Sequence, residues 1–239
     1  MNIALIGYGK MGHEIEQAAL SRGHRIVAAI DVNNLDDFDS EEFCSADVAI
    51  EFTRPDVAVG NLYRCFAAGV PVVCGTTGWS AKLDEVRRQM EKADGTLFWA
   101  SNFSLGVNLF FALNKKLAQM MNTFPDYNVR MVEVHHIQKL DAPSGTAITL
   151  AEGIIENLDR KTAWEKEVET AVDHLAIASI REGTVPGTHE VIYESDVDTI
   201  SIKHEAKNRR GLALGAVIAA EFTAGKKGFW GMNDMLTFA

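Results

Sequence analysis

The chain has 239 residues, which is enough for one large domain or two small ones with a substantial core. Its formal net charge of −10 at pH 7 disfavours nucleic acids and anionic membrane surfaces, so we expect neither as a partner. The three cysteines, Cys44, Cys65 and Cys74, favour reduced thiols in a cytoplasmic protein over a disulfide framework. We recognise no signal-peptide pattern and no apolar run long enough to span a bilayer.

The N-terminal part of the chain has the pattern of a dinucleotide-binding unit. Asn2–Ile6 is a short apolar run that predicts a buried parallel strand, and His13–Leu20 has helical spacing. Between them lies a G-x-G-x-x-G sequence in the strand–turn–helix context that makes this motif informative. Its residues are Gly7, Tyr8, Gly9, Lys10, Met11 and Gly12. The alternative is a tight turn in an α/β protein that binds no dinucleotide.

Each glycine of this motif has its own physical reason. Gly7 permits the tight turn, Gly9 lets the backbone approach a pyrophosphate, and Gly12 lets the helix and strand pack closely. The next expected strand ends in Asp31, about twenty positions past the glycines, where an acidic residue holds a ribose hydroxyl.

The residues around Asp31 bear on the choice of cofactor. The carboxylate of Asp31 would repel a 2′-phosphate, and Val32 supplies no arginine beside it. This pair favours NADH. NADPH stays open, because Lys10 could still meet a phosphate.

Strands and helices continue to alternate through the first domain, which predicts a Rossmann-type, doubly wound parallel sheet. The expected strands are Ile26–Ile30, Asp47–Ile50, Val70–Cys74 and Leu97–Ala100, and the expected helices are Asp56–Ala68 and Ser80–Ala93. Ligands of such sheets bind at the carboxyl ends of the strands. The residues at these ends, which we expect to contact a cofactor, are Phe52, Thr53, Gly75, Thr76, Thr77, Ala100, Ser101, Asn102 and Phe103. Turn chemistry explains each of them alone, and only their common location distinguishes them.

The pattern changes after residue 101, so we expect a dinucleotide-binding domain over 1–101 and a second, α+β domain with a mixed sheet over 102–210. Leu105–Phe124 predicts a long helix, with leucines near helical spacing and with Met and Phe side chains that form core. The expected strands of the second domain are Asn128–His135, Leu175–Ile180, His189–Glu194 and Thr199–His204. Further expected elements are a charged helix over Ile154–Glu169, a buried helix over Leu212–Thr223, and turns over Gly225–Gly228 and Gly231–Met235.

Chemistry-bearing side chains concentrate in Glu133–Ala147, which contains two histidines, one lysine, two carboxylates and a Gly-Thr pair. The pattern predicts a strand that ends near His135, then a polar loop, then a helix capped by Ser144 or Thr146. Neighbouring strand residues point to opposite faces, so His135 and His136 can share a pocket only if the strand ends there. Two histidines without cysteine or regular ligand spacing give little support for zinc, and we expect no metal.

Lys139 and the Gly145–Thr146 helix start make this segment a candidate site. A helix start offers unpaired N–H groups and the positive end of the helix dipole, which suit a carboxylate. Lys139 adds a full positive charge, and the histidines can donate hydrogen bonds or protons. Together these groups describe an acid beside an anion-binding cradle.

The same segment, Glu133-x-His135-His136-x-x-Lys139-x-Asp141-Ala-Pro-Ser-Gly-Thr-Ala147, resembles the signature of the dihydrodipicolinate reductase family. Gly75–Gly78 and Asn102–Asn108 are similar to the cofactor-contacting loops of that family. Arg181–Gly183 and His204–Arg209 resemble segments of its second domain, although polar strand ends explain them equally well. The chain departs from the family in Val32, where Arg is frequent, and is shorter than many members after Asp31 and around Ile155–Val172.

The resemblance implies an NAD(P)H-dependent 4-hydroxy-tetrahydrodipicolinate reductase of lysine and diaminopimelate biosynthesis. Its substrate would be a small dianionic ring. His135 would donate the proton, with Lys139 as the alternative or co-donor, and His136, Gly145 and Thr146 would hold the carboxylates. The resemblance further implies that residues 211–239 return to the first domain and that the protein is a homotetramer through the sheet of the second domain.

Two other functions remain open at this point. Another two-domain NAD-dependent dehydrogenase, acting on an amino or keto acid, would share the glycine motif but would have no reason for the His135-His136-x-x-Lys139 cluster. A non-catalytic dinucleotide sensor would need the cofactor loop but no acid beside an anion site.

Overall fold

The computed structural model describes residues 1–236 and divides into two compact units. One unit contains Met1–Leu105 and the chain from Arg210 onward, and the other contains Gly106–Arg209. The C-terminal segment expected to join the first domain, 211–239, includes residues 237–239, which lie outside the described residues.

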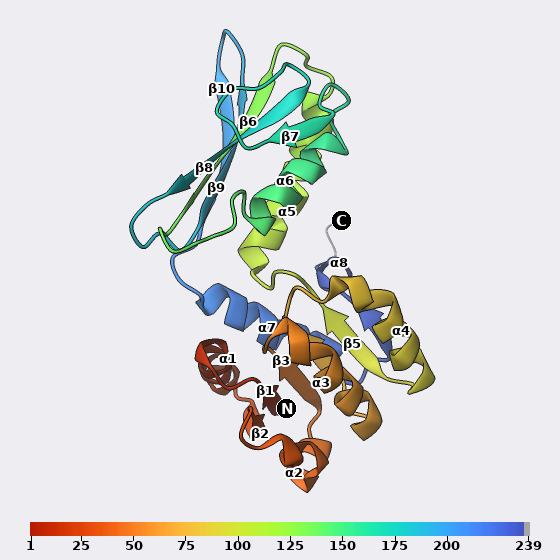
Figure 1. The fold of residues 1–239 in the computed structure, drawn as a ribbon. Helices are drawn as coiled ribbons and strands as arrows, with labels where there is room; N and C mark the ends of the chain where they lie inside the picture. Colours follow the sequence, from red (N-terminus) through yellow and green to blue (C-terminus); the bar gives the residue numbers. More distant parts are fainter. Residues whose placement is uncertain (237–239) are drawn as a thin grey trace. The chain divides into compact units, whose positions relative to one another are not determined.

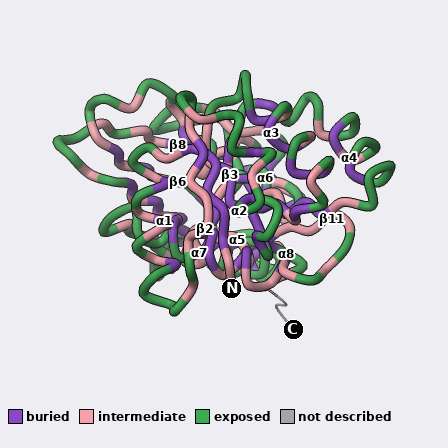
Figure 2. Tube along the Cα trace, turned by 90° about the horizontal axis from the view of Figure 1, so that it is seen from below, coloured by how far each residue is buried: buried purple, intermediate pink, exposed green. Residues whose placement is uncertain are grey.

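The first unit is built on a six-stranded sheet in which every neighbouring pair is parallel, in the order β11-β5-β4-β3-β1-β2 (Figure 1). Its strands are β1 (Asn2–Ile6), β2 (Arg25–Ile30), β3 (Val48–Glu51), β4 (Val72–Cys74), β5 (Thr96–Trp99) and β11 (Gly228–Trp230). The predicted Rossmann-type sheet is therefore confirmed. Figure 2 shows β3 as buried, as expected for a strand with helices over both faces.

Helices cover both faces of this sheet. They are α1 (Lys10–Ser21), α2 (Glu41–Cys44), α3 (Pro55–Ala68), α4 (Leu83–Lys92), α7 (Arg210–Thr223) and α8 (Met232–Met235), with short 3-10 turns η1 (Leu35–Asp39) and η2 (Ser80–Lys82). Alternate residues of β1 enter different cores: Ala4 packs on the side of α3 and α4, and Leu5 packs on the side of α1 and α7. The apolar run of β1 therefore reflects burial on both faces.

The end of the described chain differs from the prediction. The expected turn Gly225–Gly228 leads directly into the strand β11, which pairs with β5, and the expected turn Gly231–Met235 contains the single-turn helix α8. Local pattern could not identify β11, because three residues carry no periodicity and the strand is defined by its pairing across the chain. Helix α7 is buried as expected.

The second unit contains a five-stranded mixed sheet in the order β10-β9-β6-β8-β7, which confirms the predicted fold class. Its strands are β6 (Asn128–His135), β7 (Ala163–Glu165), β8 (His174–Arg181), β9 (Thr188–Glu194) and β10 (Thr199–Glu205), and its helices are α5 (Leu105–Met121) and α6 (Gly145–Ile155). Strand β6 runs parallel to β8 and antiparallel to β9. The helices pack on one face of the sheet around Val129, Met131 and Tyr193.

Two expectations for the second unit are wrong. The predicted helix Ile154–Glu169 ends at Ile155, and β7 follows as an edge strand paired with β8. Its charged residues belong to loops and an edge strand, not to a helix face. In α5 the expected core residue Met120 is 58% exposed, because the helix buries the face that carries Phe110 and Ala118.

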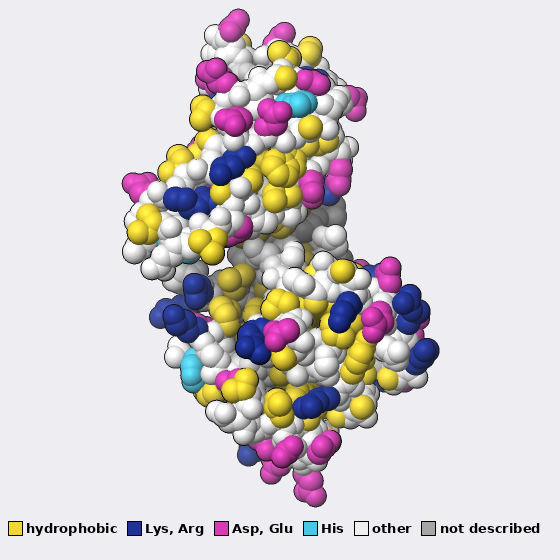
Figure 3. Space-filling view, in the orientation of Figure 1, with side chains coloured by type: hydrophobic (Ala, Val, Ile, Leu, Met, Phe, Trp, Pro, Cys, Tyr) yellow, Lys and Arg dark blue, Asp and Glu magenta, His cyan; other side chains and the backbone are white. Residues whose placement is uncertain are grey.

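The negative charge of the chain is partly concentrated at one end of the first unit. Acidic side chains gather over η1 and α2 (Figure 3). Within residues 1–236, no helix combines the length and hydropathy needed to cross a membrane.

Candidate active site

The glycine turn between β1 and α1 has the geometry of a dinucleotide-binding loop. Gly7 has φ +92°, and a side chain there would stand 2.2 Å from the carbonyl oxygen of Phe52. A Cβ at Gly12 would stand 2.4 Å from the carbonyl oxygen of Gly7. At Gly9, by contrast, a Cβ would meet no heavy atom of the described residues within 4 Å beyond its chain neighbours. Packing therefore explains two of the glycines, and the open space at Gly9 fits a bound pyrophosphate at the start of α1.

The other residues of the turn make contacts within the protein. The hydroxyl of Tyr8 donates to Glu16 at 2.5 Å, and its ring lies against His13. Lys10 is exposed at the first position of α1, and Met11 is half-buried. Of these three, Lys10 is placed to meet an anion at the helix start.

A cavity of about 490 Å³ adjoins the turn, and Gly7, Gly9, Asp31 and Val32 line it. The amide of Asp31 donates to Asn34 Oδ1 at 2.7 Å, which fixes the chain where β2 ends. The predicted glycine loop and acidic residue thus lie in one cavity.

Two arginines that we did not predict line the same cavity. Arg54 pairs with Asp56 at 3.2 Å, and Arg64 donates to the carbonyl oxygen of Leu35 at 3.4 Å. The guanidinium of Arg64 also lies over the ring of Phe38, 5.0 Å from its centroid. The sequence offered only weak signals for them, because Arg54 follows the strand β3 but Arg64 is an ordinary helix position. They add positive charge to the cavity, and the cofactor prediction from Asp31 and Val32 did not take this charge into account.

A second hollow, of about 200 Å³, brings together the predicted loops that follow β3 and β4. Its lining includes Met11, Phe52, Thr53, Gly75, Thr76 and Thr77. The backbone N–H of Thr53 donates to Thr76 Oγ1 at 2.8 Å, which joins the two loops directly. A side chain at Gly75 would overlap the ring of Phe52 at 2.1 Å.

Beside these loops lies Glu51, a fully buried carboxylate that the sequence analysis did not single out. It accepts hydrogen bonds from the hydroxyl of Thr53, from Cys74 Sγ at 3.1 Å and from Asn61 Nδ2 at 3.4 Å. Burial raises the pKa of the Cys74 thiol well above its usual value, so this thiol acts as a donor. Glu51 therefore ties the end of β3 to the end of β4.

The predicted cofactor residues after β5 differ in how far they are buried. Phe103 is fully buried, and its ring packs 5.6 Å from that of Phe52. Ala100 is also buried, Ser101 is exposed, and Asn102 Oδ1 accepts from the backbone N–H of Ser104 at 2.8 Å. The side chain of Phe103 thus serves the core, so only its backbone could contact a ligand.

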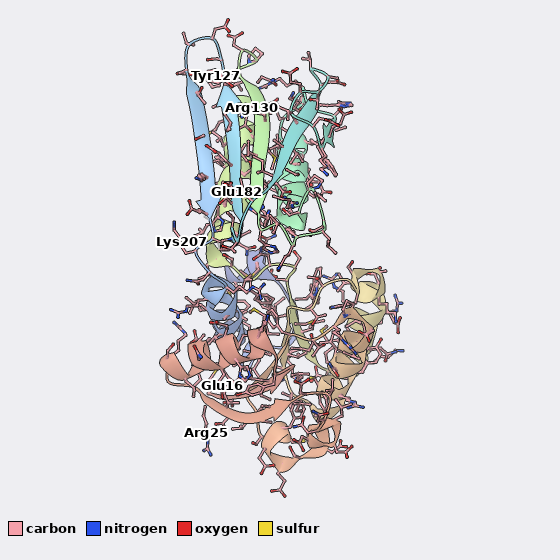
Figure 4. The ribbon with its side chains drawn as sticks, turned by 60° about the vertical axis from the view of Figure 1, so that its left-hand side comes forward. Glu16, Arg25, Tyr127, Arg130, Glu182 and Lys207 are labelled. Carbon is pink, nitrogen blue, oxygen red and sulfur yellow. The ribbon has the colours of Figure 1, made fainter. Side chains whose placement is uncertain are left out.

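In the second unit β6 ends at His135, so the alternation of strand side chains does not extend to His136. His135 continues the helix-covered face of β6, where it is 7% exposed, and its ring lies edge-on to that of His189 at 5.0 Å. His136 follows the strand, and its backbone N–H donates to the carbonyl oxygen of Val185 at 2.8 Å. Figure 4 labels Glu182 at this end of the sheet, where its N–H donates to the carbonyl oxygen of His135.

Glu133 lies at the centre of this group and is fully buried. Both of its carboxylate oxygens accept from the backbone N–H of Ser144, at 3.1 and 3.2 Å, and Arg181 Nη2 donates to Oε1 at 3.1 Å. His135 Nδ1 lies 3.3 Å from Oε2. Burial alone would raise the pKa of Glu133, but hydrogen bonds from His135, Ser144 and Arg181 outweigh it and hold that pKa well below its usual value.

Arg181 also fixes the loop that carries Lys139. Its Nη2 donates to the carbonyl oxygen of Asp141 at 2.6 Å, and its Nε donates to that of Lys139 at 3.4 Å. The ammonium group of Lys139 pairs with the carboxylate of Asp141 at 2.8 Å and lowers the pKa of that carboxyl. Since the Asp141 carboxylate is exposed, an anionic ligand could exchange with it.

The predicted anion cradle is the first turn of α6. Ser144 is the cap, and its Oγ accepts from the N–H of Ala147 at 3.2 Å, so Thr146 is not the cap. Gly145 and Thr146 occupy the first two helical positions, whose N–H groups have no partner within an α-helix. Ser144 Oγ also lies 3.1 Å from His189 Nε2.

Glu133, His135 and His189 have possible metal-ligand atoms within 4.8 Å of one another. However, backbone and guanidinium N–H groups already occupy the oxygens of Glu133, and the charge of Arg181 would repel a cation. We therefore interpret the group as a hydrogen-bond network.

Sequence reasoning assigned no role to Glu133, Arg181 or His189. Glu133 could have been recognised because it lies two residues before His135 and so shares its face of the strand. The other two come from strands β8 and β9, and only the register of the sheet brings them to Glu133.

A dinucleotide turn on a parallel sheet and a His–Lys loop beside a helix start on a second unit define a two-domain oxidoreductase that uses a nicotinamide dinucleotide. Comparison with family models identifies its kind. Residues 1–103 match the model for the N-terminus of dihydrodipicolinate reductase, and residues 106–236 match the model for its C-terminus. The chain belongs to the dihydrodipicolinate reductase family, which confirms the resemblance found in the sequence.

Individual relatives agree with this. A 4-hydroxy-tetrahydrodipicolinate reductase of Christiangramia forsetii is 48% identical over 237 residues, covering 99% of this chain and 98% of that protein. One of Ralstonia pickettii is 38% identical over 198 residues, covering 80% and 74%. The dipicolinate-bound dihydrodipicolinate reductase of Paenisporosarcina sp. TG-14 has the same fold, with a TM-score of 0.76 at 24% identity over 98% of each chain.

Proposed function

We propose that this protein catalyses the NAD(P)H-dependent reduction of 4-hydroxy-tetrahydrodipicolinate to tetrahydrodipicolinate, a step of diaminopimelate and lysine biosynthesis. Relatives with this activity in their names support it across almost the whole chain. The single observation that carries it is the arrangement of Glu133–Ala147, where one buried carboxylate holds the acid, the lysine loop and the helix start together.

The first unit would hold the cofactor. The open backbone at Gly9 suits the pyrophosphate, and Asp31 suits a ribose hydroxyl in the adjoining cavity. The loops with Phe52–Thr53 and Gly75–Thr77 would border the nicotinamide half. When bound, the reduced nicotinamide supplies the hydride.

The second unit would hold the substrate. The N–H groups of Gly145 and Thr146, the positive end of α6 and the ammonium group of Lys139 would bind its carboxylates. His136 would contribute a further hydrogen bond. This role requires Lys139 to leave Asp141 for the substrate.

His135 would deliver the proton that completes the reduction. It is a mostly buried imidazole at the end of β6, with a carboxylate beside Nδ1, and this leaves Nε2 as the donating nitrogen. Lys139 is the alternative donor, because it belongs to the same loop.

For the cofactor we propose NADH over NADPH. A 2′-phosphate bound in this cavity beside Asp31 would meet its carboxylate and the uncharged, exposed side chain of Val32. Arg54 and Arg64 in the same cavity oppose this preference with positive charge.

We also propose a homotetramer formed through the sheet of the second unit. The face of this sheet opposite α5 and α6 carries exposed residues such as Arg130, which pairs with Glu194 at 3.6 Å. Figure 4 labels Arg130 on this sheet. Light scattering after size-exclusion chromatography should give the mass of four chains, and a monomer would contradict the proposal.

A coupled assay tests the function. The protein is mixed with the condensation product of pyruvate and aspartate semialdehyde, and oxidation of NADH and of NADPH is followed separately. We expect rapid oxidation that requires both precursors. Nucleotide binding without turnover would favour a dinucleotide sensor, and turnover of an amino or keto acid instead would favour another dehydrogenase.

A further inference from the structure

We infer that Glu133 is the positioning residue of the proton donor: its carboxylate accepts the Nδ1–H of His135, fixes the tautomer and orientation of the ring, and ties the ring to the loop that carries Lys139. This inference deepens the proposed function and rests on it. It concerns a residue that contacts the donor and not the substrate.

The register of the sheet gives Glu133 this place. Glu133 and His135 are two residues apart on β6, so both side chains leave the same face. Across the antiparallel pair Glu133 lies opposite His189, and across the parallel pair it lies opposite Ser179 while His135 lies opposite Arg181. Three strands thus aim polar side chains at one buried carboxylate.

The carboxylate itself cannot turn freely. The N–H of Ser144 contacts both of its oxygens, and Arg181 Nη2 contacts Oε1. These contacts come from the cap of α6 and the end of β8, so the direction of Oε2 is set by the rest of the unit. Oε2 is the oxygen 3.3 Å from His135 Nδ1.

His135 has little choice of partner at this nitrogen. Nδ1 is buried and has no fully formed hydrogen bond among the described residues, and Oε2 of Glu133 stands beside it at 3.3 Å. On the other edge of the ring, Nε2 stands 3.0 Å from where a Cβ of Gly187 would be, so the backbone just before β9 confines the ring on that side. A proton on Nδ1 directed at Glu133 leaves Nε2 to exchange a proton with a substrate.

Several strands and a loop bring charged and titratable groups to the His135 ring. The groups that face it are Glu133 from β6, Arg181 from β8, His189 from β9, His204 from β10, and Lys139 and Asp141 from the loop. Burial, and then the proximity of His135, lower the pKa of His189 to about 4, so that ring is neutral at pH 7. Glu133 is the carboxylate paired with the His135 ring, with Oε2 3.3 Å from Nδ1.

The test compares Glu133→Gln with the wild-type chain in the coupled assay. The amide keeps the shape but removes the charge. We expect kcat to fall roughly a hundredfold, the lower end of what general acid catalysis contributes. The pH profile of kcat should differ from that of the wild type, because the amide removes the charge beside the proposed donor. The KM for the nucleotide should not change.

Glu152→Gln is the matched control, since it removes the same charge from an exposed position on α6. It should leave kcat and the pH profile unchanged. A folded Glu133→Gln with unchanged kcat and pH profile would overturn the inference. So would a variant in which only the substrate KM rises, because Glu133 would then serve the carboxylate cradle and not the donor.

A second measurement tests the inference even if Glu133→Gln fails to fold. Nitrogen NMR shifts of the wild-type His135 ring, assigned with His135→Asn, report its neutral tautomer. We expect the proton on Nδ1, and a proton on Nε2 would overturn the inference without any variant of Glu133. If wild-type protein shows no turnover at all, the proposed function fails, while this tautomer still decides the role of Glu133.

Discussion

The backbone nitrogen of Ser144 lies 3.1 Å from Oε1 and 3.2 Å from Oε2 of Glu133, a residue on the strand before its helix. The cap of α6 is therefore bound to the same carboxylate that stands beside His135. A buried carboxylate needs several donors, and here they come from the cap of α6 and from Arg181, with the ring proposed as the proton donor beside them. One side chain therefore contacts both the proposed proton donor and the start of the helix proposed to bind the carboxylates.

The acid assignment predicts the effect of two substitutions. His135→Ala should lower kcat by about 10²–10⁴-fold, the range that general acid catalysis contributes, and Lys139→Ala should also lower turnover strongly. Nucleotide affinity, measured by fluorescence titration, should stay near normal in both. Unchanged turnover in both variants would remove the site assignment.

The charge around Asp31 predicts cofactor preference. NADH should serve at least as well as NADPH in kcat/KM, and Asp31→Asn should improve NADPH relative to NADH, because a repulsive charge near the 2′-phosphate is removed. Arg64→Gln should act in the opposite direction if that guanidinium reaches the phosphate. A large wild-type preference for NADPH would contradict the charge argument.

Substitutions at two glycines of the first turn should separate an effect on nucleotide binding from an effect on stability. A Cβ at Gly12 would stand 2.4 Å from a backbone oxygen, so Gly12→Ala should lower Tm. The same change at Gly9 meets open space, so Gly9→Ala should keep Tm while weakening nucleotide binding about tenfold or more. Calorimetry and binding titration on both variants check this. Equal effects of the two changes on Tm would count against it.

Glu51 should matter for stability as well as for the loops that it joins. Glu51→Leu leaves the donors of Thr53, Asn61 and Cys74 without their acceptor, which should cost about 2–3 kcal/mol in the free energy of unfolding. Urea titration measures the loss, with Glu91→Leu on the exposed face of α4 as the control. Two variants of equal stability would mean that the network contributes nothing.

The buried acid network predicts that the protein loses stability in acid. The folded pKa values of His189 and Glu133 are both depressed, so the unfolded chain binds more protons and stability falls as pH falls. For His189 the window runs from its ordinary value of 6.5 down to about 4. The contribution of Glu133 to stability is lost as the pH falls below the ordinary pKa of a carboxyl.

Between pH 7 and pH 5 the free energy of unfolding should fall by about 2 kcal/mol through the titration of His189. Urea titrations at both values measure it. His189→Asn should flatten this dependence, and the exposed His13→Asn should not. Equal slopes for wild type and His189→Asn would contradict the assignment.

Much of the first unit was predictable because its signals are local. The apolar run of β1, the glycine turn and the start of α1 are contiguous, and each follows from steric rules that act within a few residues. The stretch from Glu133 to Ala147 was equally accessible, since a strand end, a loop and a helix cap adjoin in the chain.

Other features depended on partners far away in the sequence. Arg181 reaches Glu133 across 48 positions, and His189 reaches Ser144 across 45, because parallel and antiparallel pairing with β6 decides which side chains face one another. The edge strand β11 exists by pairing with β5, and no periodicity within three residues can reveal that.

The sequence by itself therefore determined the kind of protein, the dinucleotide turn and the contiguous acid–anion segment, because these rest on short-range sterics and on residue chemistry. Only the tertiary structure decided which buried carboxylate holds that segment together, which arginines enter the cofactor cavity and which face of α5 is buried. Those outcomes depend on sheet register and on side-chain packing between segments that the chain keeps far apart.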